Sequence, residues 1–315
     1  MTLTRTAAVA LALALPLLAG CGLRIDAPDP SPPPPSPAEA LRQREALRSA
    51  AFADGAATWG VAGSPSAERL AVNASLHLDA LGGVWEPWPD GDGPAEPDGL
   101  PLYPAPAPEF GPFETSDDLV DALAQSTPEV CEAALDATEP EAVSLYSAIC
   151  FSRTLDWDGV SRDFGIIPPE VPAVPETVGS QDPGLILTLD AAAWATDFQA
   201  AAARAAEDEG WQGLEATARG YRDLALAITS ANGWTGTEQD PRLPSYDPNA
   251  LPDQTAIAAA IAEAAVLALP NSTNRESVLD LALHYGLTAS RQGVQFDALT
   301  GLEESGPTDE SSPTG

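Results

Sequence analysis

Along the middle of the chain, apolar residues recur at the three- and four-residue spacing of amphipathic helices. Leu70, Ala74, Leu78 and Leu81 form such a stripe on a helix predicted over residues 66–81. No stretch keeps the alternation of apolar and polar residues that is typical of a half-buried strand. The pattern therefore predicts an all-α helical bundle without a sheet.

The predicted helices fall into two regions, separated by a proline-rich linker over residues 165–183. The N-terminal helical region, residues 38–164, opens with a capping box of Ser36 and Glu39. Its five helices are expected to end near residues 56, 81, 125, 137 and 157, with a Pro/Gly-rich loop over residues 84–115. A second capping box, Thr138 with Glu141, is expected to open the last of them.

The C-terminal region, residues 184–300, shows longer helical patterns. Four helices are predicted here, over residues 185–207, 211–231, 253–269 and 274–291, the last opened by a capping box of Thr273 and Glu276. A long connection, residues 233–252, separates the second from the third. Four helices with one long crossover are the arrangement of ferritin-like bundles.

The pattern at the N-terminus is typical of a secretory signal peptide. A hydrophobic run over residues 7–18 follows Arg5 and ends at Leu18-Ala19-Gly20-Cys21. This ending resembles the lipobox of bacterial lipoproteins, in which the cysteine receives the lipid. The alternative is an uncleaved transmembrane helix, but the run is shorter than the roughly 20 residues a span needs, and Pro16 interrupts it. We therefore expect residues 1–20 to be a signal peptide and Cys21 to be lipidated.

A lipid on Cys21 implies a protein anchored on the extracytoplasmic face of the cell membrane. Residues 21–37 form a proline-rich spacer that is expected to be extended, and residues 301–315 an acidic, disordered tail. Cys131 and Cys150 are then an even pair in an oxidising compartment, which predicts a disulfide. Two buried thiols are the alternative.

The formal net charge is −33, from 47 acidic and 14 basic residues, and every basic residue is arginine. Such a charge argues against nucleic acid as a partner and against docking of the protein surface on anionic lipid. It favours solubility at a crowded cell surface, with weak binding of many cations as the alternative. Alanine, proline and arginine in place of lysine suggest a GC-rich, actinobacterial genome.

Two further segments resemble a known family. Cys21 to Asp26, the proline-rich strap and the Arg-rich start of the first helix (residues 41–44) resemble the beginning of an uncharacterised actinobacterial lipoprotein family. The crossover motifs at residues 240–242 and 246–248, followed by Ala-rich helices and Arg291, are also similar to that family. The resemblance implies a C-terminal ferritin-like domain of unknown function.

Metal-bearing ferritin-like proteins use Glu-x-x-His motifs, and this chain has none. His77 is expected to be a core or interface residue, while Asp280 and His284 are spaced to form a surface ion pair. Four acids lie on the predicted long helices, and Glu263 is expected to face outward; they are Asp197, Glu215, Glu263 and Asp280. The sequence therefore predicts a metal-free bundle without a cofactor.

No catalytic constellation occurs either, since both the G-x-S-x-G elbow and the P-loop are missing. The acidic loop at residues 90–98 departs from the EF-hand pattern, which leaves weak Ca²⁺ binding as an open alternative. Trp157, Trp194 and Trp211 are expected in the core, whereas Trp85 and Trp88 are candidates for a recognition surface.

The sequence thus predicts a binding or scaffolding protein of the cell envelope, not an enzyme, whose partner would be an unknown envelope protein. A lipoprotein that binds a small ligand or weakly binds cations is the first alternative. A hydrolase or metalloenzyme is the second.

Overall fold

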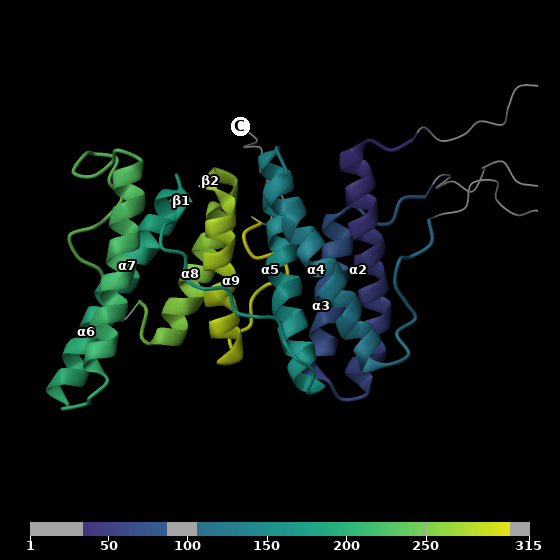
Figure 1. The fold of residues 1–315 in the computed structure, drawn as a ribbon, viewed down its shortest axis with the longest axis horizontal. Helices are drawn as coiled ribbons and strands as arrows, with labels where there is room; N and C mark the ends of the chain where they lie inside the picture. Colours follow the sequence, from purple (N-terminus) through teal and green to yellow (C-terminus); the bar gives the residue numbers. More distant parts are fainter. Residues whose placement is uncertain (1–33, 87–105, 248–249, 303–315) are drawn as a thin grey trace, which may run out of the picture. The chain divides into compact units, whose positions relative to one another are not determined.

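A computed structural model describes residues 34–86, 106–247 and 250–302 of the chain (Figure 1). It confirms the all-α prediction. The helices are α2 (Pro37–Val61), α3 (Pro65–Ala80), α4 (Ser116–Asp136), α5 (Pro140–Asp163), α6 (Pro183–Ala205), α7 (Trp211–Ala231), α8 (Gln254–Ala268) and α9 (Arg275–Arg291). The predicted signal peptide, most of the predicted spacer and nearly all of the predicted acidic tail lie outside the described residues.

The prediction that the chain has no sheet is wrong in one detail. Two short strands, β1 (Gly179–Ser180) and β2 (Ser272–Asn274), pair antiparallel beside a 3₁₀ turn at Leu269–Asn271. Strands of this length leave no alternating pattern in a sequence. Their effect is to fix the end of the linker against the turn between α8 and α9.

Two helices predicted over residues 116–137 are one. Thr127-Pro128-Glu129 reads as a helix start, yet Pro128 lies inside α4. Proline removes one backbone hydrogen bond there, but Val130, Ala133 and Ala134 continue the buried face of the helix beyond it. Packing of that face outweighs the local break.

Helix starts agree with the sequence in part. Ser36 accepts a hydrogen bond from the Glu39 amide, as expected for an N-cap. The other two predicted capping boxes are wrong, because Glu139, not Thr138, precedes α5 without a side-chain cap, and Asn274, not Thr273, caps α9. In both cases the cap lies one residue later than predicted.

The helices pack as successive pairs, α2 with α3, α4 with α5, α6 with α7 and α8 with α9. Helix α5 also packs against α3, α8 and α9, so it links the two predicted regions. The larger apolar core runs across the linker of residues 165–183: it includes Ile149 and Phe151 of α5 together with Leu189, Ile261 and Leu281. A smaller core around Phe52 and Leu123 lies among α2, α3 and α4.

Within the part of the chain that the structure describes, one segment, Gln254–Asn271, is long and apolar enough to cross a membrane. It comprises α8 and the turn that follows. Ile257, Ile261 and Ala265 of this segment are buried in the larger core. Packing inside the protein therefore accounts for part of its apolar composition, since 44% of the segment is buried.

Candidate functional site

The predicted disulfide is present. Cys131 of α4 and Cys150 of α5 are bonded, with their Cα atoms 4.9 Å apart. The same end of α4 is held from the C-terminal region, since Arg275 of α9 donates hydrogen bonds to the carbonyls of Leu135 and Ala137, at 3.1 and 2.5 Å. The C-terminus of α4 is thus fixed by a covalent bond and by a cation placed where the helix dipole favours one.

Several predicted site residues lie outside the described residues, namely Cys21, Trp88 and the loop at 90–98. Trp85 is described and is half-buried. Of the three tryptophans expected in the core, Trp157 packs against the smaller cluster. Trp194 is 41% exposed, so that prediction is wrong. It lies beside Tyr246 of the crossover, and helical spacing alone could not distinguish this partly exposed position from a core position. Trp211 is half-buried and belongs to neither core cluster.

The two histidines have different surroundings. His77 is buried on α3, as expected, and its Nε2 lies 2.9 Å from the carbonyl oxygen of Ala298. Burial, with the nearby Arg153 guanidinium, lowers the pKa of His77 to about 3. The imidazole is therefore neutral at physiological pH and holds the segment after α9 against α3.

The predicted ion pair between Asp280 and His284 does not form among the described residues. Instead, Nδ1 of His284 lies 2.8 Å from the carbonyl oxygen of Pro172 in the linker. Desolvation, followed by the negative charge of Glu276, raises the pKa of Asp280. Helical spacing placed the two side chains within reach, but the linker backbone competes for the imidazole.

A buried ion-pair network between α2 and α5 was not predicted. Both oxygens of Glu45 are used, one by Arg48 at 2.9 Å and one by Arg153 at 2.8 Å, and all three side chains are almost fully buried. Arg48 reaches outward as well, to Glu109 and Glu129 at 2.8 Å each. Burial opposes the charge of Arg48, but these carboxylates outweigh it and raise the pKa.

Two more buried carboxylates follow on α5. Asp156 accepts hydrogen bonds from Arg69 and Asn73 of α3, at 3.0 and 2.9 Å. Asp158 pairs with Arg291 of α9 at 2.6 Å and with Arg162 at 2.9 Å. Burial raises the pKa of Asp156, although Arg69 opposes this effect. Helix α5 thus carries charges that meet partners from α2, α3 and α9.

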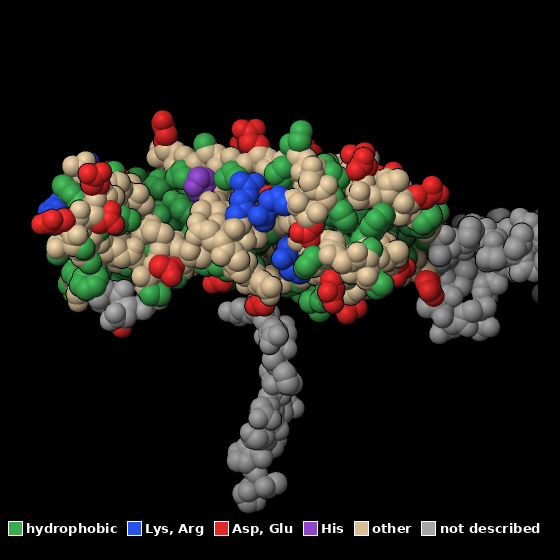
Figure 2. Space-filling model, turned by 90° about the horizontal axis from the view of Figure 1, so that it is seen from below, with side chains coloured by type: hydrophobic (Ala, Val, Ile, Leu, Met, Phe, Trp, Pro, Cys, Tyr) green, Lys and Arg blue, Asp and Glu red, His purple; other side chains and the backbone are tan. Residues whose placement is uncertain are grey.

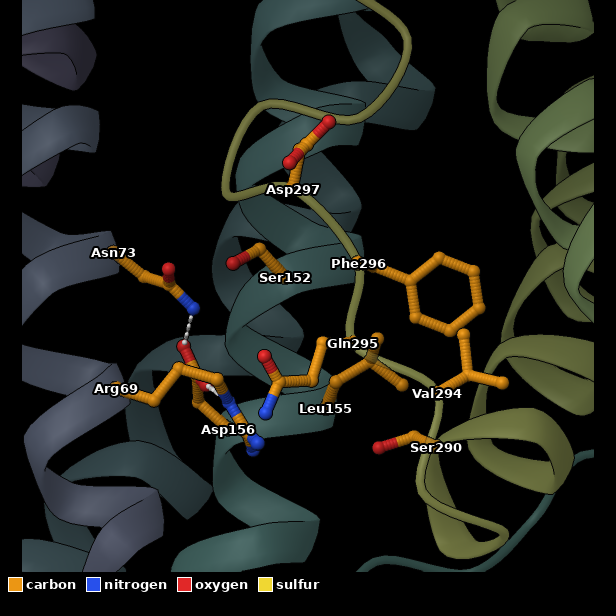
Figure 3. A pocket seen from close by; sticks show the side chains of 10 residues that line it. All are labelled: Arg69, Asn73, Ser152, Leu155, Asp156, Ser290, Val294, Gln295, Phe296 and Asp297. Atoms are coloured by element: carbon orange, nitrogen blue, oxygen red, sulfur yellow. Dashed lines mark hydrogen bonds and ion pairs between the residues drawn. The ribbon is translucent and has the colours of Figure 1, made fainter.

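Figure 3 shows the surroundings of Asp156, where a cavity of about 10 Å³ lies between α3, α5 and the segment after α9. Arg69 and Asn73 converge on the carboxylate, and Gln295 faces this pair. The Ser152 hydroxyl lines the same cavity, is buried and has no hydrogen-bond partner among the described atoms. The volume fits one water molecule, so we interpret this as a structural water site.

The sequence did carry a signal for the network. Glu45, Arg48, Ser49 and Phe52 follow the three- and four-residue spacing of one helix face, which places charges on the apolar stripe of α2. Buried charges are rare unless they are paired. A charged residue on an apolar stripe therefore indicates a buried partner, here Arg153.

Larger openings lie elsewhere. The first, which we call the acidic groove, has a volume of about 830 Å³ and lies between the start of α2, the end of α4 and the start of α5. We define it by Leu41, Arg44, Glu132, Asp136, Glu139 and Tyr146. The second, the tyrosine groove, has a volume of about 610 Å³ and is lined by Pro175, Gly220, Tyr221, Leu224 and Tyr285.

Metal ligands do not gather in the described part of the chain, where no group of three or more His, Cys, Asp or Glu could hold an ion. Asp197 pairs with Arg222, and Glu215 with Arg204. Glu263 is exposed, as expected, and desolvation with the charge of Asp297 raises its pKa. The acids of the long helices therefore point to separate places.

Comparison with family models, with curated proteins and with solved structures gave no match. The resemblance to an actinobacterial lipoprotein family, with the ferritin-like domain it implies, stays a prediction from the sequence.

Proposed function

We propose that this protein is a lipid-anchored component of the cell envelope, attached through Cys21 on the extracytoplasmic face, with a binding or scaffolding role. The observation that carries the location is the Cys131–Cys150 disulfide. Disulfides persist in oxidising compartments and are rare in the cytosol. Together with the lipobox-like ending at Cys21, the disulfide supports export and anchoring.

The binding role is supported by the contrast between the charged side chains, which are paired in the interior, and the grooves, which are open at the surface. The buried charges of α2 and α5 are neutralised by one another, and Asp156 opens only on a cavity the size of one water. The acidic groove and the tyrosine groove are open and large, in the range of binding clefts.

A small-ligand role is the second candidate, and the tyrosine groove favours it. Tyr221 and Tyr285 are buried neighbours with ring centroids 5.9 Å apart, from α7 and α9. Desolvation, then the neighbouring Tyr221, raises the pKa of Tyr285, so both hydroxyls stay neutral. Aromatic walls with neutral hydroxyls suit an apolar molecule with one polar group.

The order of helices α6–α9 along the chain supports the predicted ferritin-like fold. Two helix pairs, α6 with α7 and α8 with α9, are separated by the long connection between residues 231 and 254. In our proposal this region is a metal-free scaffold for the grooves.

The anchor is tested with Cys21→Ala in cells fed a labelled fatty acid. The expected result is loss of the label and release of the protein from the membrane or retention of the uncleaved precursor. Cys131→Ala combined with Cys150→Ala is the matched control, which should keep the label. A Cys21→Ala chain that still takes up fatty acid and stays on the membrane would refute the anchor.

A further inference from the structure

The acidic groove has the shape of a site for a helix. Three helices form its walls, with Leu41 of α2, Ala133 of α4 and Ala142 of α5 giving it apolar surface. Its volume of about 830 Å³ is in the range of clefts that bind ligands. Apolar grooves between helices are a common receptor for one amphipathic helix of a partner.

A polar group inside the groove lacks a partner. Tyr146 is 6% exposed and lines the groove, and its hydroxyl forms no hydrogen bond within the part of the chain that the structure describes. The hydroxyl oxygen is not among the buried atoms that lack a partner in the described residues, so it is accessible from the open groove. This hydroxyl is therefore available to a group that enters the groove from outside.

The rim of the groove is negative. Glu132 and Asp136 lie one helical turn apart on α4, and Glu139 follows in the turn to α5. All three are exposed, and none has an ion-pair partner among the described side chains. Arg44, the one cation that lines the groove, is 3.9 Å from both Glu45 and Glu129. The groove thus presents uncompensated carboxylates around apolar walls.

The walls are also held in place. Cys131 lies on α4 beside Glu132, and Cys150 lies one turn beyond Tyr146 on α5, so the disulfide joins two of the helices that line the groove. A groove fixed in this way loses little freedom when it binds.

Three kinds of segment could occupy the groove: residues 21–33 of the same chain, a second copy of the chain, or a partner protein. Their charges differ. Residues 21–33 of the chain carry Arg24 against Asp26 and Asp29, so this segment offers no excess of positive charge. A second copy carries a formal charge of −33 and would be repelled. A basic partner would gain from both the carboxylates and the apolar walls.

We propose that the acidic groove binds an amphipathic helix of a partner protein, one that presents apolar side chains flanked by Lys or Arg. This assignment rests on the binding role proposed above and names the class of partner.

The test uses the whole chain in phosphatidylcholine nanodiscs, titrated with a labelled peptide of about 18 residues, or five helical turns. The peptide contains leucine on one face and lysine on the other, and empty nanodiscs give the lipid contribution. Its counterpart with glutamate in place of lysine should not bind. Fatty-acid labelling tests the anchor separately, so lost peptide binding with an intact label overturns the groove alone.

Charge reversal locates the site. Glu132→Lys with Asp136→Lys should weaken peptide binding about tenfold or more. The control, Asp117→Lys with Asp121→Lys, changes two exposed acids with the same spacing on the same helix, away from the groove. It should change the affinity less than about twofold. Equal losses in both variants would show that binding follows net charge, and would overturn the proposal.

A second test fills the groove with a large side chain and leaves the net charge of the protein unchanged. Ala40→Trp adds a large side chain at an exposed position that lines the groove, and Ala57→Trp adds it elsewhere on α2. The first should abolish binding and the second leave it unchanged, with both proteins folded by circular dichroism. Unaltered binding in Ala40→Trp, or crosslinking of the groove to residues 21–33 or to a second copy, would overturn the assignment.

Discussion

Helices α2 and α5 bury charged side chains, whereas α6–α9 bury none among the residues that the structure describes. Glu45, Arg48, Arg153, Asp156 and Asp158 are nearly inaccessible to solvent, and each pairs with an opposite charge. In the described part of α6–α9, the buried polar side chains are neutral hydroxyls; they are Thr196, Thr229 and Ser277. One chain therefore uses two ways of holding helices together.

Buried ion pairs affect which arrangement of the helices forms more than they affect how stable that arrangement is. A buried ion pair costs desolvation that its attraction only partly repays, but it strongly disfavours any arrangement that separates the charges. The ion pairs of α5 with Glu45 of α2, Arg69 of α3 and Arg291 of α9 therefore fix how each of these helices is aligned along α5. Alanines such as Ala192 and Ala262 instead allow α6 and α8 to approach closely, and that contact is stabilised by apolar packing.

Removing Glu45 should have the largest effect. Glu45→Ala leaves Arg153 buried without its carboxylate, which we expect to lower the free energy of unfolding by about 3–5 kcal/mol. Chemical denaturation of the purified protein measures the loss. Glu45→Met with Arg153→Met is the control and should recover most of it, because Arg48 keeps Glu109 and Glu129. A double variant as unstable as Glu45→Ala would mean that lost packing, and not an unpaired charge, causes the loss of stability.

Loss of the disulfide should come next. Cys131→Ala with Cys150→Ala opens a loop with a sequence separation of 19 residues, which predicts a loss of about 3 kcal/mol from chain entropy. Thermal unfolding with and without reductant provides the comparison, since reductant should destabilise the native chain alone. An equal response of both proteins to reductant would contradict the prediction.

Acid should destabilise the protein through His77. The native pKa is about 3, below the ordinary 6.5, so the unfolded chain takes up a proton first as the pH falls. The free energy of unfolding should therefore fall by about 2 kcal/mol between pH 7 and pH 5 from this group. His77→Gln, which can still donate to the Ala298 carbonyl, should lack this contribution. Identical pH profiles for the two proteins would show that carboxylates account for the whole loss.

An exposed ion pair of the C-terminal region should have the smallest effect. Arg222 on α7 pairs with Asp197 on α6, and both side chains are about half exposed. Arg222→Ala should change the free energy of unfolding by less than about 1 kcal/mol, and salt should remove the difference. Urea titrations at low and high ionic strength measure it. A loss as large as that of Glu45→Ala would remove the contrast between the two regions.

The sequence predicted helices better than what holds them together. Apolar periodicity located α6–α9 within a few residues, because their buried faces are mostly apolar and carry no charge. Periodicity did not predict that α4 is continuous. Pro128 indicates a helix start locally, whereas the packing that carries α4 past this proline depends on contacts with other parts of the fold. Spacing within α2 can indicate that Glu45 needs a buried partner, but it cannot identify that partner as Arg153, which lies far away in the chain. The acidic groove is likewise formed by three separate helices.

Gly286 of α9 faces the ring of Phe151 of α5, and a Cβ atom built on this glycine would overlap that ring. The ring therefore occupies a notch in α9, at the contact between the two regions. To slide along α5, α9 would have to lift off by the thickness of the ring before it could move. If the chain is pulled through its N-terminal spacer, this joint transmits the load from α5 to α9 without slip, so the two regions should yield together in a single step of force.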